Sequence, residues 1–509
     1  MHNPQVDYNI AGSVLKRAQL DPGKRAIIFE STQRSYAELS ERVCKLAQNL
    51  RDHGVCVGDR VAYVGLNHPA FLETMLAAQS LGAIFVPLNF RLTGEELTFI
   101  INDAGVNTLV ADDALAAVID PVRADLCCTR YIGSESAEGD WESLEALISA
   151  SEPLTSFIQT QQDDVAIIMY TSGTTGRPKG AMLTHGNLMW NNIQAAFALP
   201  ALASDVSLVC APLFHVGGLN VTTMSCLQAG GCLLLHRSFD PAATLSDVAQ
   251  HKVTTMFAAP AMLLFMAQQP EFADTELSSL RMIVVGAAPV PKSLLAVFNE
   301  RHIPLNQGYG LTETSPLVSF LMSEYTEAKL GSAGKPGLFG EIRVADASGD
   351  SVAAGEVGEI LYRGPNVMKG YWNRPEATAE AIDEKGWFHT GDAGYLDEDG
   401  FLFISDRVKD MVISGGENVY PAEVESVLFE HPAIAEVAII GLPDDKWGEA
   451  VTAVAALNPE ASLTLDELRD FADGKLARYK LPLRLHLVEA LPRNPAGKVL
   501  KFKLREELA

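Results

Sequence analysis

A polar run that could bind phosphate follows an apolar segment near position 165. Residues 165–169 have the pattern of a buried strand. The polar run supplies Thr171, Ser172, Gly173, Thr174, Thr175, Gly176 and Lys179 as candidate ligand contacts. Glycines let the backbone fold back and direct several N–H groups at one point. Together with hydroxyls and cations, such donors suit an anionic oligophosphate.

The polar run is not a Walker-type phosphate loop. That motif needs Gly-Lys followed by Ser or Thr, whereas Lys179 lies between Pro178 and Gly180. The run resembles the signature of the adenylate-forming superfamily, which includes acyl-CoA synthetases, adenylation domains of peptide synthetases and firefly luciferase. The alternative, a surface loop of small polar residues, is disfavoured by so many specified positions in succession.

Two further motifs could hold the base of a nucleotide. Gly286, Ala287 and Ala288 follow a predicted strand over 282–285, and their short side chains would let a flat ring lie against the backbone. An ordinary strand-to-helix turn would have the same residues. Tyr309 stands next to Gly310, where its ring could stack on a base. The resemblance implies adenine at both motifs.

The resemblance also assigns residues to phosphate, metal and ribose. Thr312 would contact the α-phosphate, and Glu313 with Thr174 would hold Mg²⁺, which prefers oxygen ligands. Asp392 would accept hydrogen bonds from the ribose hydroxyls, helped by Arg407. An aspartate in such a position is otherwise a common turn residue.

The resemblance to the family assigns a role to Lys498, which would neutralise charge during attack on the α-phosphate. A lone lysine near the end of a chain is otherwise usually solvated. His215 lies in an apolar run, where a histidine is more often a satisfied core residue than a catalyst. The family places an aromatic residue or a histidine here, beside the acyl carboxylate, so both interpretations are kept.

The last hundred residues carry motifs for a second substrate. Gly415 and Gly416 permit close approach to a thin ligand, which the resemblance identifies as the pantetheine of coenzyme A. Lys409 matches the hinge about which the family's small domain rotates between half-reactions. Relatives often have a Tyr-Lys-x-Pro-Lys run, but Leu483 replaces its last lysine here. We assign Lys480 to the coenzyme A phosphates, with Arg484 as a further candidate.

The elements that must position these residues alternate between strand and helix patterns. Regular alternation predicts an α/β fold with doubly wound parallel sheets and ligand sites at the carboxyl ends of strands. We expect an N-terminal AMP-binding domain over 1–405, with α/β subdomains at 1–160 and 161–330 and a β-rich subdomain at 331–405. A hinge at 406–409 and a small mobile α+β domain over 410–509 follow.

Composition limits the partners and the compartment. A net charge of −25 over 509 residues argues against nucleic acid or an anionic membrane as the main partner. Seven cysteines without a C-x-x-C pair support neither a disulfide framework nor a zinc site, so a reducing cytoplasm is expected. The N-terminus has no signal-peptide pattern. Residues 206–235 contain no charged side chain, but prolines and glycines interrupt them, which favours buried strands and a helix over a membrane span.

The resemblance covers almost the whole chain and is nearest to bacterial fatty-acyl-CoA and feruloyl-type aryl-CoA ligases. It implies that ATP, Mg²⁺ and coenzyme A serve a reaction in which a carboxylate forms an acyl-AMP and then a thioester. No acidic residue lies between Asp205 and Asp240, which disfavours an ammonium-bearing acid. We expect a medium- or long-chain fatty acid, with an aryl acid as the alternative. A stand-alone enzyme that loads a carrier protein, a luciferase-like oxygenase and a non-catalytic nucleotide sensor stay open. Assembly as a homodimer also stays open.

Overall fold

The computed structural model describes residues 9–135, 139–171, 178–288, 290–407, 410–414, 417–444, 446–473, 475–493 and 499–508. The chain divides into two compact units, formed by residues 1–342 with 362–388 and by residues 343–361 with 389–509. The architecture confirms the α/β class. The predicted hinge at 406–409 includes positions outside the described residues and stays a prediction.

One sheet of the first unit is mostly parallel. Its strands are β1 Arg25–Phe29, β2 Thr32–Ser35, β10 Val206–Val209, β11 Cys232–Leu235, β12 Thr255–Ala258, β13 Met282–Val285, β14 Leu305–Gly310, β15 Leu317–Leu321 and β16 Lys335–Pro336. Within the described residues their order is β16-β15-β14-β13-β12-β10-β11-β1-β2. Strands β1, β11, β10, β12, β13 and β14 pair in parallel. Strands β2, β15 and β16 are antiparallel to their neighbours at the two edges.

The second sheet of this unit carries the phosphate motif. Its strands are β3 Arg60–Val64, β4 Ile84–Leu88, β5 Val106–Ala111, β6 Arg130–Gly133, β7 Glu142–Ser143, β8 Val165–Thr171, β9 Lys179–Thr184 and β19 Gly370–Tyr371. They lie in the order β19-β9-β8-β4-β3-β5-β6-β7. Strands β3 to β8 pair in parallel, while β9 and β19 are antiparallel.

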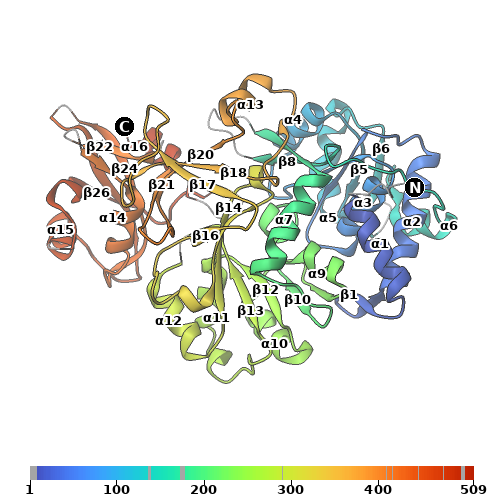
Figure 1. Ribbon diagram of the computed structural model, residues 1–509, viewed down its shortest axis with the longest axis horizontal. Helices are drawn as coiled ribbons and strands as arrows, with labels where there is room; N and C mark the ends of the chain where they lie inside the picture. Colours follow the sequence, from blue (N-terminus) through green and yellow to red (C-terminus); the bar gives the residue numbers. More distant parts are fainter. Residues whose placement is uncertain are drawn as a thin grey trace. The chain divides into compact units, whose positions relative to one another are not determined.

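Helices cover both faces of each sheet. Successive residues of a strand point to opposite sides, so both faces carry apolar side chains against which helices pack. Val61 and Tyr63 of β3 join one apolar cluster, and Ala62 and Val64 join another. The helices of the first unit are α1 Ile10–Leu20, α2 Tyr36–Asp52, α3 Pro69–Ser80, α4 Gly94–Ala104, α5 Asp113–Ile119, α6 Leu144–Ala150, α7 His185–Ala198, α8 Val216–Asn220, α9 Thr223–Ala229, α10 Pro241–His251, α11 Pro260–Ala267, α12 Lys292–Glu300 and α13 Pro375–Ala381. Figure 1 shows α10, α11 and α12 gathered beside β12 and β13.

The second unit is richer in antiparallel strands. Most of a sheet with the order β17-β18-β20-β21 belongs to it, and a sheet with the order β23-β22-β25-β24, joined by β26, completes it. The strands are β17 Glu341–Ala345, β18 Gly358–Arg363, β20 Phe388–Leu396, β21 Leu402–Arg407, β22 Val412–Ser414, β23 Glu417–Val419, β24 Ile434–Asp444, β25 Gly448–Leu457 and β26 Arg484–Leu487. The helices are α14 Pro421–Leu428, α15 Leu465–Ala472 and α16 Lys501–Leu508.

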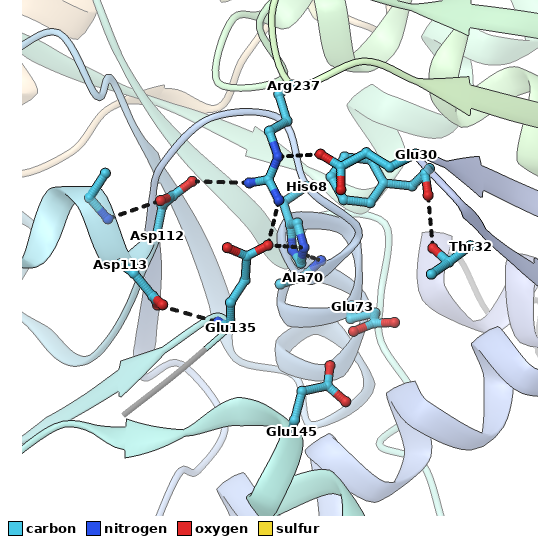
Figure 2. A network of polar contacts seen from close by, with 12 residues as sticks. Glu30, Thr32, His68, Ala70, Glu73, Asp112, Asp113, Glu135, Glu145 and Arg237 are labelled. Carbon is cyan, nitrogen blue, oxygen red and sulfur yellow. Dashed lines mark hydrogen bonds and ion pairs between the residues drawn. The ribbon is translucent and has the colours of Figure 1, made fainter. Parts of the chain in front are cut away.

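Arg237 links the carboxyl edges of the two sheets in the first unit (Figure 2). Its Nε donates to Glu30, which follows β1, at 2.6 Å. Its other nitrogens reach Glu135 after β6 at 2.5 Å and Asp112 after β5 at 3.9 Å. Nε2 of His68 lies 3.4 Å from the same Glu135 carboxylate. One guanidinium therefore joins residues from both sheets through three carboxylates.

The long uncharged segment folds into the two predicted strands, β10 and β11, but two short helices, α8 and α9, lie between them where one helix was predicted. Among the described residues, none of the helices combines the length and the apolar character needed to cross a membrane.

Candidate active site

The phosphate motif is framed by a hairpin. Thr171 at the end of β8 is the register partner of Lys179 at the start of β9. Ser172, Gly173, Thr174, Thr175 and Gly176 lie between these ends, outside the described residues. The hairpin itself was not predicted, because the sequence shows only that the second strand exists and not which way it runs.

A partly buried brace holds the β8 side of this hairpin. The Tyr170 hydroxyl donates to Asp103 Oδ2 at 2.7 Å, and Arg374 donates to Asp103 Oδ1 at 2.6 Å. Burial, together with the Asp103 carboxylate, raises the pKa of Tyr170. The tyrosine therefore stays a neutral donor at physiological pH, and the strand leading into the phosphate motif is fixed to α4 and α13.

Tyr371 connects two predicted ligand residues. Its hydroxyl donates to Glu313 Oε1 at 2.8 Å. The Lys179 ammonium lies 5.2 Å from the centroid of the Tyr371 ring. Tyr371 belongs to β19, where it is paired with Ala181 of β9. This role of Tyr371 was not predicted from the sequence, although its place in Gly370-Tyr371-Trp372 beside an edge strand is the signal that could have drawn attention to it.

The carboxylate of Glu313 is mostly buried and lies on a fixed turn, which suits a residue predicted to bind Mg²⁺ together with substrate phosphates. Glu313 lies on a short 3₁₀ helix, Thr312–Thr314, and is 9% exposed. Its backbone carbonyl accepts a hydrogen bond from the Met368 N–H at 2.8 Å, which fixes the turn. Within the described part of the chain, no group of three or more histidine, cysteine or acidic side chains could hold a metal ion. Mg²⁺ usually keeps several waters and binds through one or two carboxylates and substrate phosphates, and a single buried glutamate is compatible with that mode of binding.

The two predicted adenine motifs lie on adjacent strands. Val285 of β13 pairs with Gln307 of β14, so Gly286 and Tyr309 both follow at the same sheet edge. A Cβ added at Gly286 would lie 3.0 Å from the Gly308 carbonyl oxygen, so the two backbones are in close contact. Ala287 has a left-handed φ of 72°. The structure thus brings these predicted residues together.

His215 is placed by the first turn of α8, where it is the N-cap residue. Its ring packs against Phe214 with 4.2 Å between centroids. The residue as a whole is partly exposed, but its Nε2 atom is buried and has no hydrogen-bond partner among the described residues. Burial, with a smaller effect from the Arg91 guanidinium, lowers the pKa of His215 to about 4. His215 is therefore a neutral imidazole at pH 7.

This lowered pKa predicts a pH dependence of stability. An unfolded histidine has a pKa of about 6.5, so the unfolded state binds more protons than the folded state between about pH 6.5 and 4. The contribution of the neutral His215 side chain to the free energy of unfolding is complete above about pH 6.5. It is lost, by about 1.4 kcal/mol per pH unit, as the pH falls toward 4. We expect His215→Gln to make the melting temperature fall less steeply across this window. The exposed His53→Gln is the control; identical slopes in the wild type and His215→Gln would contradict the assignment.

Asn67 holds the segment that leads to His215. Its Nδ2 donates to the Ala211 carbonyl at 3.0 Å, and its Oδ1 accepts from the Leu213 N–H at 2.8 Å. Its own N–H donates to the Arg237 carbonyl at 3.1 Å. Asn67 is 3% exposed. This clamp was not predicted, since a single asparagine far from the motif gives no signal of its partner.

The second unit holds the remaining predicted ligand residues. Asp392 of β20 is the register partner of Arg407 on β21, and Asp392 is 7% exposed. The Asp392 N–H donates to Thr390 Oγ1 at 3.0 Å, which fixes the strand at this point. The Arg407 side chain lies outside the described part of the structure. Outside the described residues lie Lys409, Gly415, Gly416 and Lys498.

The two cations assigned to coenzyme A phosphates each have a carboxylate partner. Lys480 Nζ lies 2.6 Å from Glu423 Oε1. Partial burial lowers the pKa of Lys480, but the Glu423 carboxylate outweighs it, so the pKa is raised overall. Arg484 lies 2.8 Å from Asp444. A phosphate at either residue would compete with an existing ion pair, and both roles stay predictions.

Comparison with known proteins identifies the family. The model for the AMP-binding enzyme family matches residues 14–372, and the model for its C-terminal domain matches residues 423–498. The chain is 44% identical to a feruloyl-CoA synthase from Amycolatopsis sp, over 96% of this chain and 97% of the relative. It is 38% identical to the long-chain-fatty-acid–CoA ligase FadD13 of Mycobacterium tuberculosis, over 98% of each chain. It also matches the structure of o-succinylbenzoate coenzyme A synthetase from Bacillus subtilis in complex with ATP and magnesium ion, with a TM-score of 0.88 and 34% identity over 97% of this chain and 98% of the other.

The chain belongs to the AMP-binding enzyme family, and these relatives are acid:CoA ligases. This confirms the resemblance to the adenylate-forming superfamily and the expectation of an enzyme. The assignment of each site residue stays a prediction.

The Tyr371 contact predicts a change in metal dependence. Tyr371→Phe removes the donor to Glu313, so the carboxylate loses the partner that orients it. We expect the Mg²⁺ concentration for half-maximal pyrophosphate release to rise roughly tenfold. ATP quenching of tryptophan fluorescence, with and without Mg²⁺, gives a second readout. Tyr325→Phe, at a residue 44% exposed, is the control. An unchanged Mg²⁺ titration would exclude this role for Tyr371.

Proposed function

We propose that this protein is an AMP-forming ligase that joins an aromatic carboxylic acid, such as a hydroxycinnamate, to coenzyme A. The observation that carries the choice of acid is the 44% identity to a feruloyl-CoA synthase along almost the whole of both chains. Identity to the fatty-acid ligase is lower, at 38% over a similar length. The sequence alone led us to expect a fatty acid, with an aryl acid as the alternative. We now propose the aryl acid first.

The absence of an ammonium partner supports an uncharged acid tail. Asp205 and Asp240 bound the segment that carries His215. Asp205 is 2% exposed and forms a short ion pair with Arg281. Asp240 caps α10 by accepting from the Ala243 N–H at 2.7 Å. Both carboxylates thus have structural partners, and an amino-acid substrate would bring an unpaired ammonium group.

The proposed reaction has two steps. In the first, the acid carboxylate attacks the α-phosphorus of ATP, the bond to the pyrophosphate oxygen breaks, and acyl-AMP forms. Lys498 and Thr312 stabilise the charge on the transferring phosphate, while Tyr309 and Asp392 hold the base and ribose. Mg²⁺, held by Glu313 and Thr174 when bound, neutralises phosphate charge. In the second, the coenzyme A thiolate attacks the acyl carbonyl and AMP leaves.

His215 is suited to a neutral role in this scheme. Its low pKa leaves it uncharged, so its free Nε2 can make one hydrogen bond to the acid without forming an ion pair that would hold the carboxylate back from attack. Asn67 is a positioning residue that keeps the His215 segment in place.

A fatty acid is the second candidate, supported by the uncharged segment around α8 and by the relative FadD13. Loading of a carrier protein is the third. The cysteines are all free, which supports the cytoplasmic location that we propose. A homodimer stays a prediction.

Pyrophosphate release separates the candidates. The assay uses ATP and Mg²⁺ with benzoates, cinnamates and fatty acids of increasing length, each with and without coenzyme A. Sustained turnover of cinnamates that requires coenzyme A is the expected result. Preference for fatty acids would overturn the choice of acid. A single burst that coenzyme A cannot convert to turnover would overturn the choice of acceptor.

A further inference from the structure

An open hollow lies between α13 and the β19 edge of the eight-stranded sheet, within the first compact unit. Its volume is about 490 Å³. Pockets for small molecules usually have volumes of about 300–1,000 Å³ and mostly apolar walls. The apolar walls of this hollow come from Met182 of β9, Tyr371 of β19, and Pro375, Ala379 and Ile382 in and after α13. The hollow therefore has the size and the walls to hold the rings or the chain of an organic molecule.

One end of the hollow lies far from the phosphate motif. That motif follows the carboxyl end of β8 at Thr171. Lys369 lines the hollow, and its Nζ donates to the Asp163 carbonyl at 3.0 Å, just before β8 begins at Val165. Strand β8 is 7 residues long. A strand rises about 3.3 Å per residue, so the two ends of β8 are roughly 20 Å apart. A ligand held at Lys369 would therefore leave the phosphate motif unoccupied.

The charged side chains that line the hollow are both cations. They are Lys369 and Arg374, and none of the described lining residues is acidic, although the chain has a net charge of −25. Arg374 is paired with Asp103 at 2.6 Å. None of the described carboxylates forms an ion pair with Lys369, whose ammonium uses one of its three N–H donors on the Asp163 carbonyl. The other donors of Lys369 can bind an anionic group.

Close packing fixes the α13 side of the hollow. Gly370 has a φ of 142°, and a Cβ added there would lie 2.6 Å from Cγ2 of Thr378. Thr378 Oγ1 accepts from the Tyr371 N–H at 2.9 Å and donates to the Arg374 carbonyl at 2.9 Å. The walls are thus held in place before a ligand arrives, which reduces the free energy that ordering would cost on binding.

We propose that this hollow is a binding site for an organic anion with an apolar tail, separate from the phosphate motif. The anionic group lies beside Lys369, and the tail packs against Met182 and Ile382. A cationic amphiphile would meet Lys369 and Arg374 without an opposite charge, which disfavours it. A small inorganic anion would leave the apolar walls in water. The site does not depend on which acid the enzyme activates.

Decane-1-sulfonate is the probe for this site. It has the required charge and tail, and it is not a carboxylic acid that could be passed to coenzyme A. Binding to the full chain is measured by isothermal titration calorimetry without ATP, below the concentration at which the probe forms micelles. We expect the sulfonate to bind, decan-1-ol to bind more weakly and decyltrimethylammonium not to bind. Equal affinity for the three compounds, or no binding of the sulfonate, would overturn the proposal.

Two variants locate the bound sulfonate. Lys369→Glu should weaken binding roughly tenfold, because an attraction is replaced by a repulsion. Lys385→Glu makes the same change at an exposed lysine that does not line the hollow, and serves as the matched control. Ala379→Phe fills the hollow from an exposed position on α13 and should abolish binding. The melting temperature of each variant checks that it is folded.

Pyrophosphate release by the same variants shows whether the hollow is a separate site. Loss of sulfonate binding in Lys369→Glu and Ala379→Phe, with KM for the acid and for ATP unchanged, would support the proposal. Wild-type affinity for the sulfonate in both variants would place the probe elsewhere and overturn it. A parallel rise in KM for the acid would make the hollow part of the catalytic site, which also overturns it. A wild type that turned over none of the acids would contradict the proposed function alone.

Discussion

Lys498→Ala is expected to reduce acyl-AMP formation roughly 100- to 1,000-fold, the range found when one group that stabilises transition-state charge is removed. The lysine neutralises charge that builds up on the carboxylate and the α-phosphate while pyrophosphate leaves, and the second half-reaction contains no attack on phosphorus. Thioester formation from supplied acyl-AMP should therefore be largely retained. The two rates are measured separately, by pyrophosphate release and by thioester formation.

Two further variants test whether the effect belongs to this position. Lys503 is an exposed lysine on α16, so Lys503→Ala removes the same charge nearby and should leave both rates near the wild-type values. Lys498→Arg keeps the charge with a different shape and should recover part of the first rate. An equal loss of both half-reactions in Lys498→Ala would contradict the assignment of this lysine to adenylation.

Glu313→Gln is expected to lower kcat/KM for MgATP roughly 100-fold, because a neutral amide is a poor ligand for a hard cation. The substituted amide would keep the volume of the carboxylate and could still accept from Tyr371, so the turn should stay folded. The second half-reaction, started from acyl-AMP, involves no MgATP and should change little.

The measurement is an Mg²⁺ titration of pyrophosphate release, together with the melting temperature. Glu324→Gln changes an exposed carboxylate eleven residues further along and serves as the control. If Glu313→Gln kept the wild-type Mg²⁺ dependence, the metal would have to be held by other oxygens.

Strand positions could be predicted from the sequence because buried parallel strands are short, continuous apolar runs. The predicted strand over 282–285 coincides with β13, and the strand predicted from 165 extends two residues further as β8. Strand direction was not predicted at the sheet edges. β9 and β15 are antiparallel to β8 and β14, and only a short stretch of sequence separates the two strands of each pair.

The nucleotide motifs could be found because each is continuous in sequence. Their supporting residues could not, since each acts across a long separation. Tyr371 reaches Glu313 over 58 residues, and Asn67 reaches Leu213 over 146. Such contacts become visible only once the sheet order is known.

The ion pair between Glu30 and Arg237 spans 207 residues of sequence, and β1 beside it pairs in parallel with β11. A ribosome adds about 5–20 residues per second, so the first strand waits roughly 10–40 s for its neighbour to be made. Throughout that time Ile28, which is buried in a cluster whose other members all lie beyond position 207, lacks the side chains that cover it in the finished sheet. The first strand of the N-terminal hairpin therefore leaves one apolar face uncovered on the nascent chain until β11 has been made.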